Sequence, residues 1–185
     1  MKKILQISLQ KIGGGAIDSL EWSNAFCQNE MPHQVIISSG NELIDRWDKN
    51  IFRDVFKLNT YKSSLRDFLL RTFLFYRPLA LIKKIISSRP DVVLITHFHP
   101  WVIFVLLCKT FLHFRLVYAV HENPFSQKEN NNKFFNLLEK FFFISADSIV
   151  VHSKFLESQV RSSSSKPIWL LPLGSYPSLF PEFIK

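Results

Sequence analysis

The sequence Arg89-Pro-Asp-Val-Val-Leu-Ile-Thr-His97-Phe-His99-Pro-Trp101 decides the fold. Its apolar run from Val92 to Ile95 is short and continuous, which is typical of a central parallel strand covered on both faces. The chain then turns polar, and Pro100 ends the extended segment and can begin a helix. Because ligands of open α/β sheets bind beyond the carboxyl ends of the strands, we expect a site at His97 and His99.

The same layout repeats along the chain, because strand patterns alternate with helix patterns. Pro78 lies inside one helix pattern and predicts a break near Arg77. The alternation predicts right-handed crossovers, and therefore an α/β fold: a single Rossmann-like, doubly wound domain with a mostly parallel sheet of about seven strands and helices on both faces. The predicted strands are 3–8, 34–38, 55–58, 92–96, 115–120, 148–151 and 168–171. The first predicted helix has Asp18 or Ser19 in its first turn and ends near Glu30, and the others are 65–87, 101–112, 133–144 and 153–160.

Length and composition fit one well-packed domain. The chain has 185 residues, of which 47% are hydrophobic, so it can bury a full core and is not a disordered protein. Its net charge of +8 favours anionic partners, but the basic residues are dispersed among apolar ones rather than clustered, which argues against nucleic acid. Cys27 and Cys108 lie in apolar, helix-like settings and are expected to be core thiols in a reducing compartment.

The sequence shows no signal peptide, and its best candidate for a membrane span is poor. Residues 101–120 are apolar overall but contain Lys109, His113 and Arg115, which a true span would rarely carry near its centre. The segment divides more naturally into a helix followed by a strand. We therefore expect a cytoplasmic protein, with peripheral binding at the inner face of the cell membrane as an alternative.

Three consecutive glycines follow the first predicted strand. Gly13, Gly14 and Gly15 allow close approach of a ligand to the backbone, and the amides of a following helix favour an anion. The sequence matches neither the dinucleotide fingerprint nor the P-loop. From the residues alone, a plain tight turn and a ligand-binding loop are equally compatible with this stretch.

The histidines after two predicted strands allow several readings. His97 and His99 could hydrogen-bond a sugar or phosphate, could bind a metal together with His121, or could be structural. His121 and Glu122 follow the next strand, where a carboxylate beside an imidazole could serve as a general base or could cap the turn. His152 with Ser153 ends a further strand, and there a helix cap is favoured.

Residues 65–86 mix phenylalanine and leucine with arginine and lysine. Basic residues among aromatic ones suit a helix that lies on an anionic bilayer. An ordinary helix with its apolar face on the sheet and its cations in water explains the same pattern. Both interpretations remain open at this point.

The order of these motifs resembles the N-terminal domain of GT-B glycosyltransferases, in particular the family 4-like group. No single motif is specific, but their order and spacing cover nearly the whole chain. The matching stretches are the opening strand with its glycines (3–16), the strand with two histidines (89–99), the strand ending in His121-Glu122 (116–122), the helix and strand from Leu138 to Ser153, and Trp169-Leu-Leu-Pro-Leu-Gly174.

The resemblance implies a two-domain enzyme whose N-terminal domain binds the acceptor and whose other domain holds the nucleotide-sugar. It implies that Gly13, Gly14 and Gly15, with His97 and His99, bind substrate. His121 and Glu122 are the candidate catalytic residues, which an inverting reaction would need and a retaining one, as family 4 implies, would not. We expect neither a metal nor a cofactor.

The expected function is that of the acceptor-binding half of a glycosyltransferase in polysaccharide biosynthesis. It would transfer a sugar from a nucleotide-sugar to a glycan or lipid-linked acceptor, with the donor-binding domain supplied from elsewhere, for example by a partner protein. Residues 1–175 would form the Rossmann-like domain and residues 176–185 a truncated linker or tail. The alternative is a non-catalytic remnant or a binding module at an anionic membrane surface.

Overall fold

A computed structural model describes residues 2–47, 50–60, 65–74, 77–121 and 133–171. Within these ranges seven strands form one sheet in which every pairing is parallel, in the order β3-β2-β1-β4-β5-β6-β7. The strands are β1 (Ile4–Ser8), β2 (His33–Ser38), β3 (Arg53–Leu58), β4 (Val92–Ile95), β5 (Arg115–Val120), β6 (Ser148–Val151) and β7 (Ile168–Leu170). The predicted Rossmann-like fold is confirmed.

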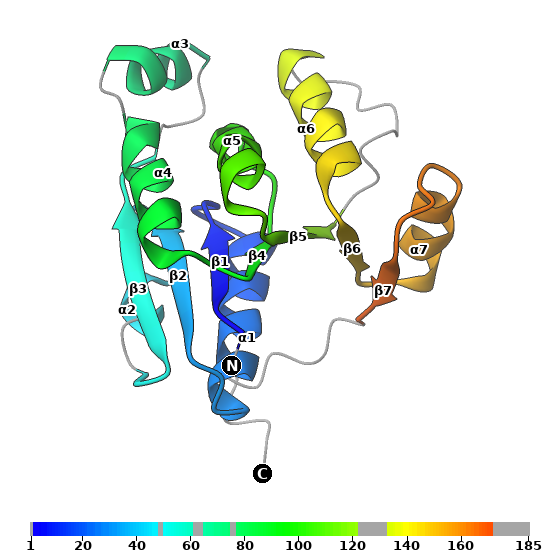
Figure 1. The fold of residues 1–185 in the computed structure, drawn as a ribbon, viewed down its shortest axis with the longest axis horizontal. Coiled ribbons are helices and arrows are strands. Elements are labelled where there is room, and N and C mark those ends of the chain that lie inside the picture. The colour runs from blue at the N-terminus through cyan, green and yellow to red at the C-terminus, as the bar shows by residue number, and fades with distance from the viewer. Residues whose placement is uncertain (1, 48–49, 61–64, 75–76, 122–132, 172–185) are drawn as a thin grey trace.

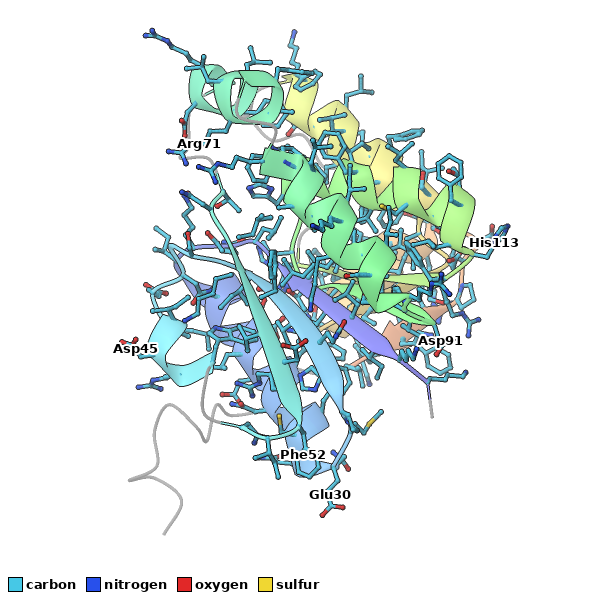
Figure 2. The ribbon with its side chains drawn as sticks, turned by 60° about the vertical axis from the view of Figure 1, so that its left-hand side comes forward. Glu30, Asp45, Phe52, Arg71, Asp91 and His113 are labelled. Atoms are coloured by element: carbon cyan, nitrogen blue, oxygen red, sulfur yellow. The ribbon has the colours of Figure 1, made fainter. Side chains whose placement is uncertain are left out.

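Helices cover both faces of this sheet (Figures 1 and 2). Helices α1 and α2 lie on one face, and α4, α5 and α6 lie side by side on the other. The helical segments are α1 (Gly14–Gln28), α2 (Ile44–Trp47), α3 (Leu65–Leu69), the π-helix η1 (Leu70–Leu74), α4 (Arg77–Ser88), the 3-10 turn η2 (Pro100–Val102), α5 (Ile103–Leu112), α6 (Lys133–Ser145) and α7 (Lys154–Arg161).

Two helical segments differ from the sequence prediction. The first helix begins at Gly14, earlier than predicted, because Gly13 alone makes the turn with a φ of 81°. The helix expected over 65–87, with a break near Arg77, comprises α3, η1 and α4; the break is confirmed, and the π-helix η1 was not predicted. The last of these begins at Arg77, directly before Pro78, as a proline at the first turn allows.

The two faces of the sheet bury cores of unequal size. The larger core lies under α4 to α7 and includes the fully buried Trp101, Phe142 and Phe143. The smaller core lies under α1 and α2, around Leu20 and Trp47. In the larger core, the burial of Phe142 and of Phe143 each contributes roughly 1.5–3 kcal/mol to the stability of the fold. The two cysteines are free and buried, as predicted.

The strand order reverses at β1, which pairs with β2 on one side and β4 on the other. The register on the β4 side joins Ile4 to Val92 and Ile7 to Ile95. Ligands of such sheets bind in the crevice beyond the carboxyl ends of the strands, at the point where the order reverses. The fold therefore places Gly13 to Gly15 and the residues after β4 at the same edge.

The segment 101–120 divides into the end of η2, α5 and β5, as the sequence predicted. In the part of the chain that the structure describes, no helix combines the length and the apolar composition needed to cross a bilayer.

Candidate functional site at the carboxyl end of the sheet

The glycine turn after β1 is held in place by the loop after β2. The amide of Gly13 donates a hydrogen bond to Oε1 of Glu42 (2.7 Å), and the amide of Glu42 donates to the carbonyl of Lys11 (2.8 Å). The side-chain amide of Asn41 donates to the carbonyl of Gln10 (3.0 Å). These bonds fix the turn from which α1 begins.

The three glycines have three different environments. A Cβ on Gly13 would meet the steric strain of its left-handed backbone, whereas a Cβ on Gly14 would have no neighbour within 4 Å. A Cβ on Gly15 would lie 2.5 Å from Cε1 of His97. Gly15 therefore makes room for the imidazole of His97, and Gly14 leaves its surroundings open.

Three histidine rings stack along the carboxyl ends of adjacent strands. The ring centroids of His97 and His121 are 4.3 Å apart, and those of His121 and His152 are 4.9 Å apart. Because β4, β5 and β6 are neighbours in the sheet, a histidine just after each strand falls in the same row. The structure thus brings His97 and His121 together, as the sequence led us to expect, and adds His152.

His99 faces a different neighbour. Its Nδ1 lies 3.2 Å from the amide of Trp101 and accepts its hydrogen bond, which caps η2, and its ring meets the Trp101 indole edge-on. Burial, with a smaller contribution from the charge of Lys11, lowers the pKa of His99 to about 3. This imidazole is therefore neutral at physiological pH.

Asp18 on α1 is the carboxylate of the site. Its Oδ2 lies 3.4 Å from Nε2 of His121 and 3.8 Å from Nε2 of His152, and its side chain is 6% exposed. Burial raises the pKa of Asp18, against the opposing effects of the two histidines and of a hydrogen bond from Trp22. A buried carboxylate is unfavourable when it is charged, and a bound cation or a hydrogen-bond donor would stabilise it.

A buried set of hydrogen bonds sets the position of α1 over the strands. The hydroxyls of Ser19 and Thr96 lie 2.6 Å apart, and the side-chain amide of Gln6 donates to the carbonyl of Ser19 (2.6 Å). Nε2 of His121 lies 2.9 Å from the carbonyl of Thr96. Asp18 and His121 are therefore held by neighbours that are themselves fixed.

Sequence reasoning missed Asp18 and His152 as members of the site. Ser153 does cap α7, since its hydroxyl accepts a hydrogen bond from the amide of Leu156 at 3.1 Å. This capping role explained the His152-Ser153 pair, so His152 was not assigned to the site. A signal was present for His152: it follows its strand directly, as His121 does. Glu122, the other expected catalytic residue, lies outside the described residues.

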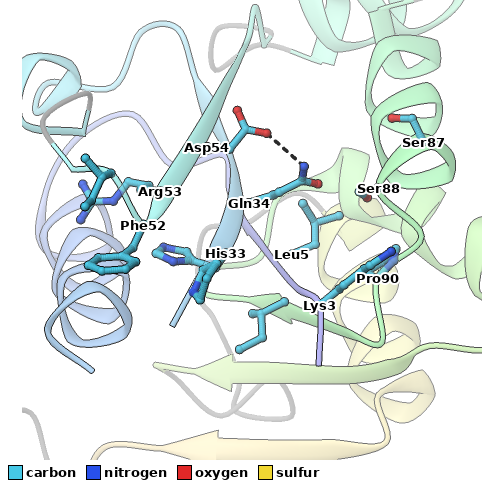
Figure 3. Close-up of a pocket in the computed structure, with 13 residues that line it drawn as sticks. Lys3, Leu5, His33, Gln34, Phe52, Arg53, Asp54, Ser87, Ser88 and Pro90 are labelled. Carbon is cyan, nitrogen blue, oxygen red and sulfur yellow. Dashed lines mark hydrogen bonds between the residues drawn. The ribbon is translucent and has the colours of Figure 1, made fainter. Parts of the chain in front are cut away.

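A hollow of about 540 Å³ lies at the opposite, amino end of β1, β2 and β3 (Figure 3). Two of the charged side chains that line it make hydrogen bonds to neighbouring residues. Asp54 accepts from Gln34 (3.0 Å) and Lys84 (3.1 Å), and Arg53 donates to the carbonyl of Trp47 (3.1 Å). The carboxylate of this hollow, Asp54, is therefore partnered, whereas Oδ2 of Asp18 at the carboxyl end has no hydrogen bond.

The fold and its polar edge define a Rossmann-like domain of the kind that makes up half of a GT-B glycosyltransferase. Residues 12–175 match the model of Glycosyltransferase Family 4, and the chain belongs to that family. The match is consistent with the N-terminal domain, as the motif order implied. No curated protein matches the sequence.

Solved structures share the fold at low sequence identity. Arabidopsis thaliana UGT89C1 complexed with quercetin has a TM-score of 0.59 at 13% identity, covering 98% of this chain and 54% of its own. A protein described as a UDP-N-acetylglucosamine 2-epimerase from Listeria monocytogenes has a TM-score of 0.62 at 17% sequence identity. The match covers 90% of this chain and 44% of that protein. UDP-glucose: anthocyanidin 3-O-glucosyltransferase in complex with UDP has a TM-score of 0.60 at 12% sequence identity. The match covers 95% of this chain and 54% of that protein. The chain spans about half the length of these proteins.

Proposed function

We propose that this chain is the acceptor-binding half of a glycosyltransferase. It moves a sugar from a nucleotide-sugar to a glycan or lipid-linked acceptor, together with a donor-binding domain supplied from elsewhere. The observation that carries this proposal is the gathering of His97, His121 and Asp18 beside the glycine turn, at the carboxyl end of a Glycosyltransferase Family 4 domain. The bound UDP of a structural neighbour supports a nucleotide-sugar as donor.

The open surroundings of Gly14 suit the close approach of a ligand to the backbone at the start of α1. Helix amides at such a position favour an anionic group, such as a phosphate. His97, held against Gly15, and His121 lie beside this turn, and imidazole nitrogens can hydrogen-bond the hydroxyls of a sugar. In this proposal the glycines position the ligand and the histidines read its polar groups.

His121 and Glu122 are the proposed catalytic pair for an inverting reaction, in which a base removes the proton of the acceptor hydroxyl. The retaining reaction that the family resemblance implies needs no such base. His121 then serves to bind the sugar or the acceptor. Product stereochemistry distinguishes these two roles.

The test is transfer of labelled sugar from a panel of nucleotide-sugars to membrane and glycan acceptors, with and without candidate donor-domain proteins. We expect transfer only when a donor domain is present, and a loss of at least about tenfold in His97→Ala. His113→Asn is the matched control, because His113 follows α5 away from the site, its side chain is exposed, and asparagine tolerates its left-handed backbone. A folded chain that supports no transfer with any donor domain would refute the proposal.

A second candidate function, binding to an anionic membrane surface, has its own observation. Phe134, Leu137, Phe141 and Ile144 on α6 are each about half exposed or more, and their spacing places them along one stripe of the helix. Such an apolar stripe on a chain of net charge +8 suits a helix lying at a bilayer interface.

Liposome flotation with anionic vesicles tests this second function. The double variant Leu137→Asp with Phe141→Asp should lose flotation and remain folded, because both side chains are exposed. The control is Ile51→Asp, which changes an exposed apolar residue two positions before β3. Strand β3 is at one edge of the sheet, and α6 lies over the other half (Figure 1). Equal flotation of the wild type and the double variant would exclude α6 as the membrane contact.

A further inference from the structure

Two buried acceptor atoms face each other at the carboxyl end of the sheet. Oδ2 of Asp18 and Nε2 of His152 are 3.8 Å apart, neither has a hydrogen-bond partner, and the two side chains are 6% and 8% exposed. Nδ1 of His152 lies 2.8 Å from the carbonyl of Leu171, which can only accept a hydrogen bond. The proton of a neutral His152 is therefore on Nδ1, and Nε2 presents its lone pair to the carboxylate.

This arrangement is unfavourable unless a positive charge lies between the two atoms. Buried polar atoms in folded proteins nearly always have a partner, and an unpartnered one costs about 1–3 kcal/mol. The carboxylate oxygen and the imidazole lone pair are both electron-rich and converge at this distance. This pair of atoms therefore suits a cation.

His121 supplies a third ligand. One donor atom from each of Asp18, His121 and His152 lies within 4.8 Å of the other two. Oδ2 of Asp18 and Nε2 of His121 are separated by 3.4 Å. In a tetrahedral zinc site with ligand bonds of about 2.0–2.2 Å, ligand atoms are about 3.3–3.6 Å apart. A movement of about an ångström would bring the set to that geometry.

The outer contacts of the cluster are those that hold metal ligands in place. A metal-bound histidine usually donates its other N–H to a carbonyl or carboxylate, which fixes its tautomer, and His152 does this with Leu171. Trp22 hydrogen-bonds the side chain of Asp18 and orients it in the same way. One contact opposes binding: His121 would exchange its contact with the Thr96 carbonyl for the metal.

We propose that Asp18, His121 and His152 bind a divalent transition metal of the Zn²⁺ type. Two imidazoles and one carboxylate suit zinc and its neighbours rather than Mg²⁺ or Ca²⁺, which prefer oxygen ligands throughout. Three protein ligands leave a fourth position for water or for an anionic oxygen, as in catalytic rather than structural zinc sites.

The metal site is independent of the proposed transfer reaction, because metal binding is measured without donor or acceptor. The two proposals do constrain each other. A metal bound by His121 prevents this residue from acting as a base, so a loaded site agrees with the retaining reaction and not with the inverting one.

The experiment uses the tag-free full chain after treatment with a chelator. Calorimetric titration with Zn²⁺ should show one ion bound per chain, and Co²⁺ should give the strong visible absorption of a four-coordinate site. Affinity should fall at least about 100-fold in Asp18→Asn and in His152→Gln, because both are direct ligands and loss of an outer-shell partner alone costs about 10–100-fold. The control His113→Asn should bind as the wild type does, since asparagine tolerates the left-handed backbone of that position.

Circular dichroism of each variant verifies folding before titration. Asp18→Asn conserves the shape of the side chain, so it separates loss of the ligand from loss of the fold. Absence of a one-to-one Zn²⁺ complex in the wild type would overturn the proposal. Equal affinities in the wild type and a folded Asp18→Asn variant would also overturn it, because the ions would then bind elsewhere.

Discussion

The two ends of the sheet hold their carboxylates in opposite ways. At the amino end, Asp147 accepts the amide of Leu116 (2.7 Å) and the ammonium of Lys109 (2.6 Å), and so ties β5, β6 and α5 together. At the carboxyl end, Oδ2 of Asp18 has no hydrogen bond and faces two histidines. The carboxylate at the amino end therefore stabilises the fold, whereas the one at the carboxyl end has an oxygen that can still bind a ligand.

The pKa values of the two carboxyls follow this difference. Burial would raise the pKa of Asp147, but the hydrogen bond from Leu116 and the contacts with Lys109 outweigh it and lower the pKa. Burial raises the pKa of Asp18, and the charges of His121 and His152 do not fully compensate. Folding therefore favours the charged form of Asp147 and disfavours that of Asp18.

The largest effect should come from breaking the amino end. We expect Asp147→Ala to lower the free energy of unfolding by about 2 kcal/mol, chiefly because the buried Leu116 amide loses a charged acceptor. Urea denaturation measures it. The control is Asp54→Ala, which removes an exposed pair with Lys84 and should cost less than about 1 kcal/mol. Equal losses in the two variants would contradict the distinction.

The pH dependence of His99 should give the next largest effect. The pKa of His99 is about 3 in the fold and 6.5 when unfolded, so the unfolded state binds more protons between these values. Stability is then fully present above pH 6.5 and is lost as the pH falls, by up to about 2 kcal/mol between pH 6.5 and 5.

Asparagine at position 99 would retain an acceptor for the Trp101 amide without a titrating group. His99→Asn should therefore lose less stability than the wild type when denaturation is repeated at pH 7 and pH 5. An NMR titration of the His99 ring gives the pKa directly. A midpoint above pH 5 would contradict a pKa of His99 lowered to about 3.

The glycine turn offers a matched pair of variants. Gly13→Ala should lower the free energy of unfolding by about 1–2 kcal/mol, because alanine is strained at a φ of 81°. Gly14→Ala should leave stability unchanged or slightly higher, because its Cβ meets nothing within 4 Å and alanine favours a helix. Thermal denaturation compares them, and a destabilised Gly14→Ala would show that its surroundings are filled.

The smallest effect on stability should come from the carboxyl end. Asp18→Asn removes a buried charge and allows an amide N–H to point at Nε2 of His152. We expect the free energy of unfolding to stay equal or to rise by up to about 1 kcal/mol in metal-free protein. If urea denaturation shows that the free energy of unfolding falls by more than about 1 kcal/mol, the Asp18 carboxylate stabilises the fold, which contradicts this expectation.

The sequence carried the fold and part of the site. Alternating apolar runs predicted the parallel sheet, and His97 with His121 could be paired because consecutive strands in this topology are usually neighbours. Asp18 could not be found in this way. An aspartate inside a helix pattern looks like any polar helical residue until the packing of α1 on the sheet decides which way it points.

The helical features that were not predicted have the same kind of cause. Whether Gly14 and Gly15 extend the turn or begin the helix depends on the backbone angle at Gly13 and on its bond to Glu42, which lies far away in the sequence. The π-helix η1, which was also not predicted, makes a long-range contact, since the Trp101 indole donates to Thr72 (2.8 Å) within it. Local patterns do not contain such contacts.

The pairing of Ile4 with Val92 has a consequence for the synthesis of the protein on the ribosome, because the two strands are far apart in the sequence. At about 5–20 residues per second, the ribosome needs roughly 4–18 seconds to deliver the second partner of β1. During that interval the future centre of the sheet is an open edge, and open edges recruit strands from other chains. Slow synthesis of residues 9–91 should therefore increase aggregation of the nascent chain, whereas faster synthesis of the same stretch should decrease it.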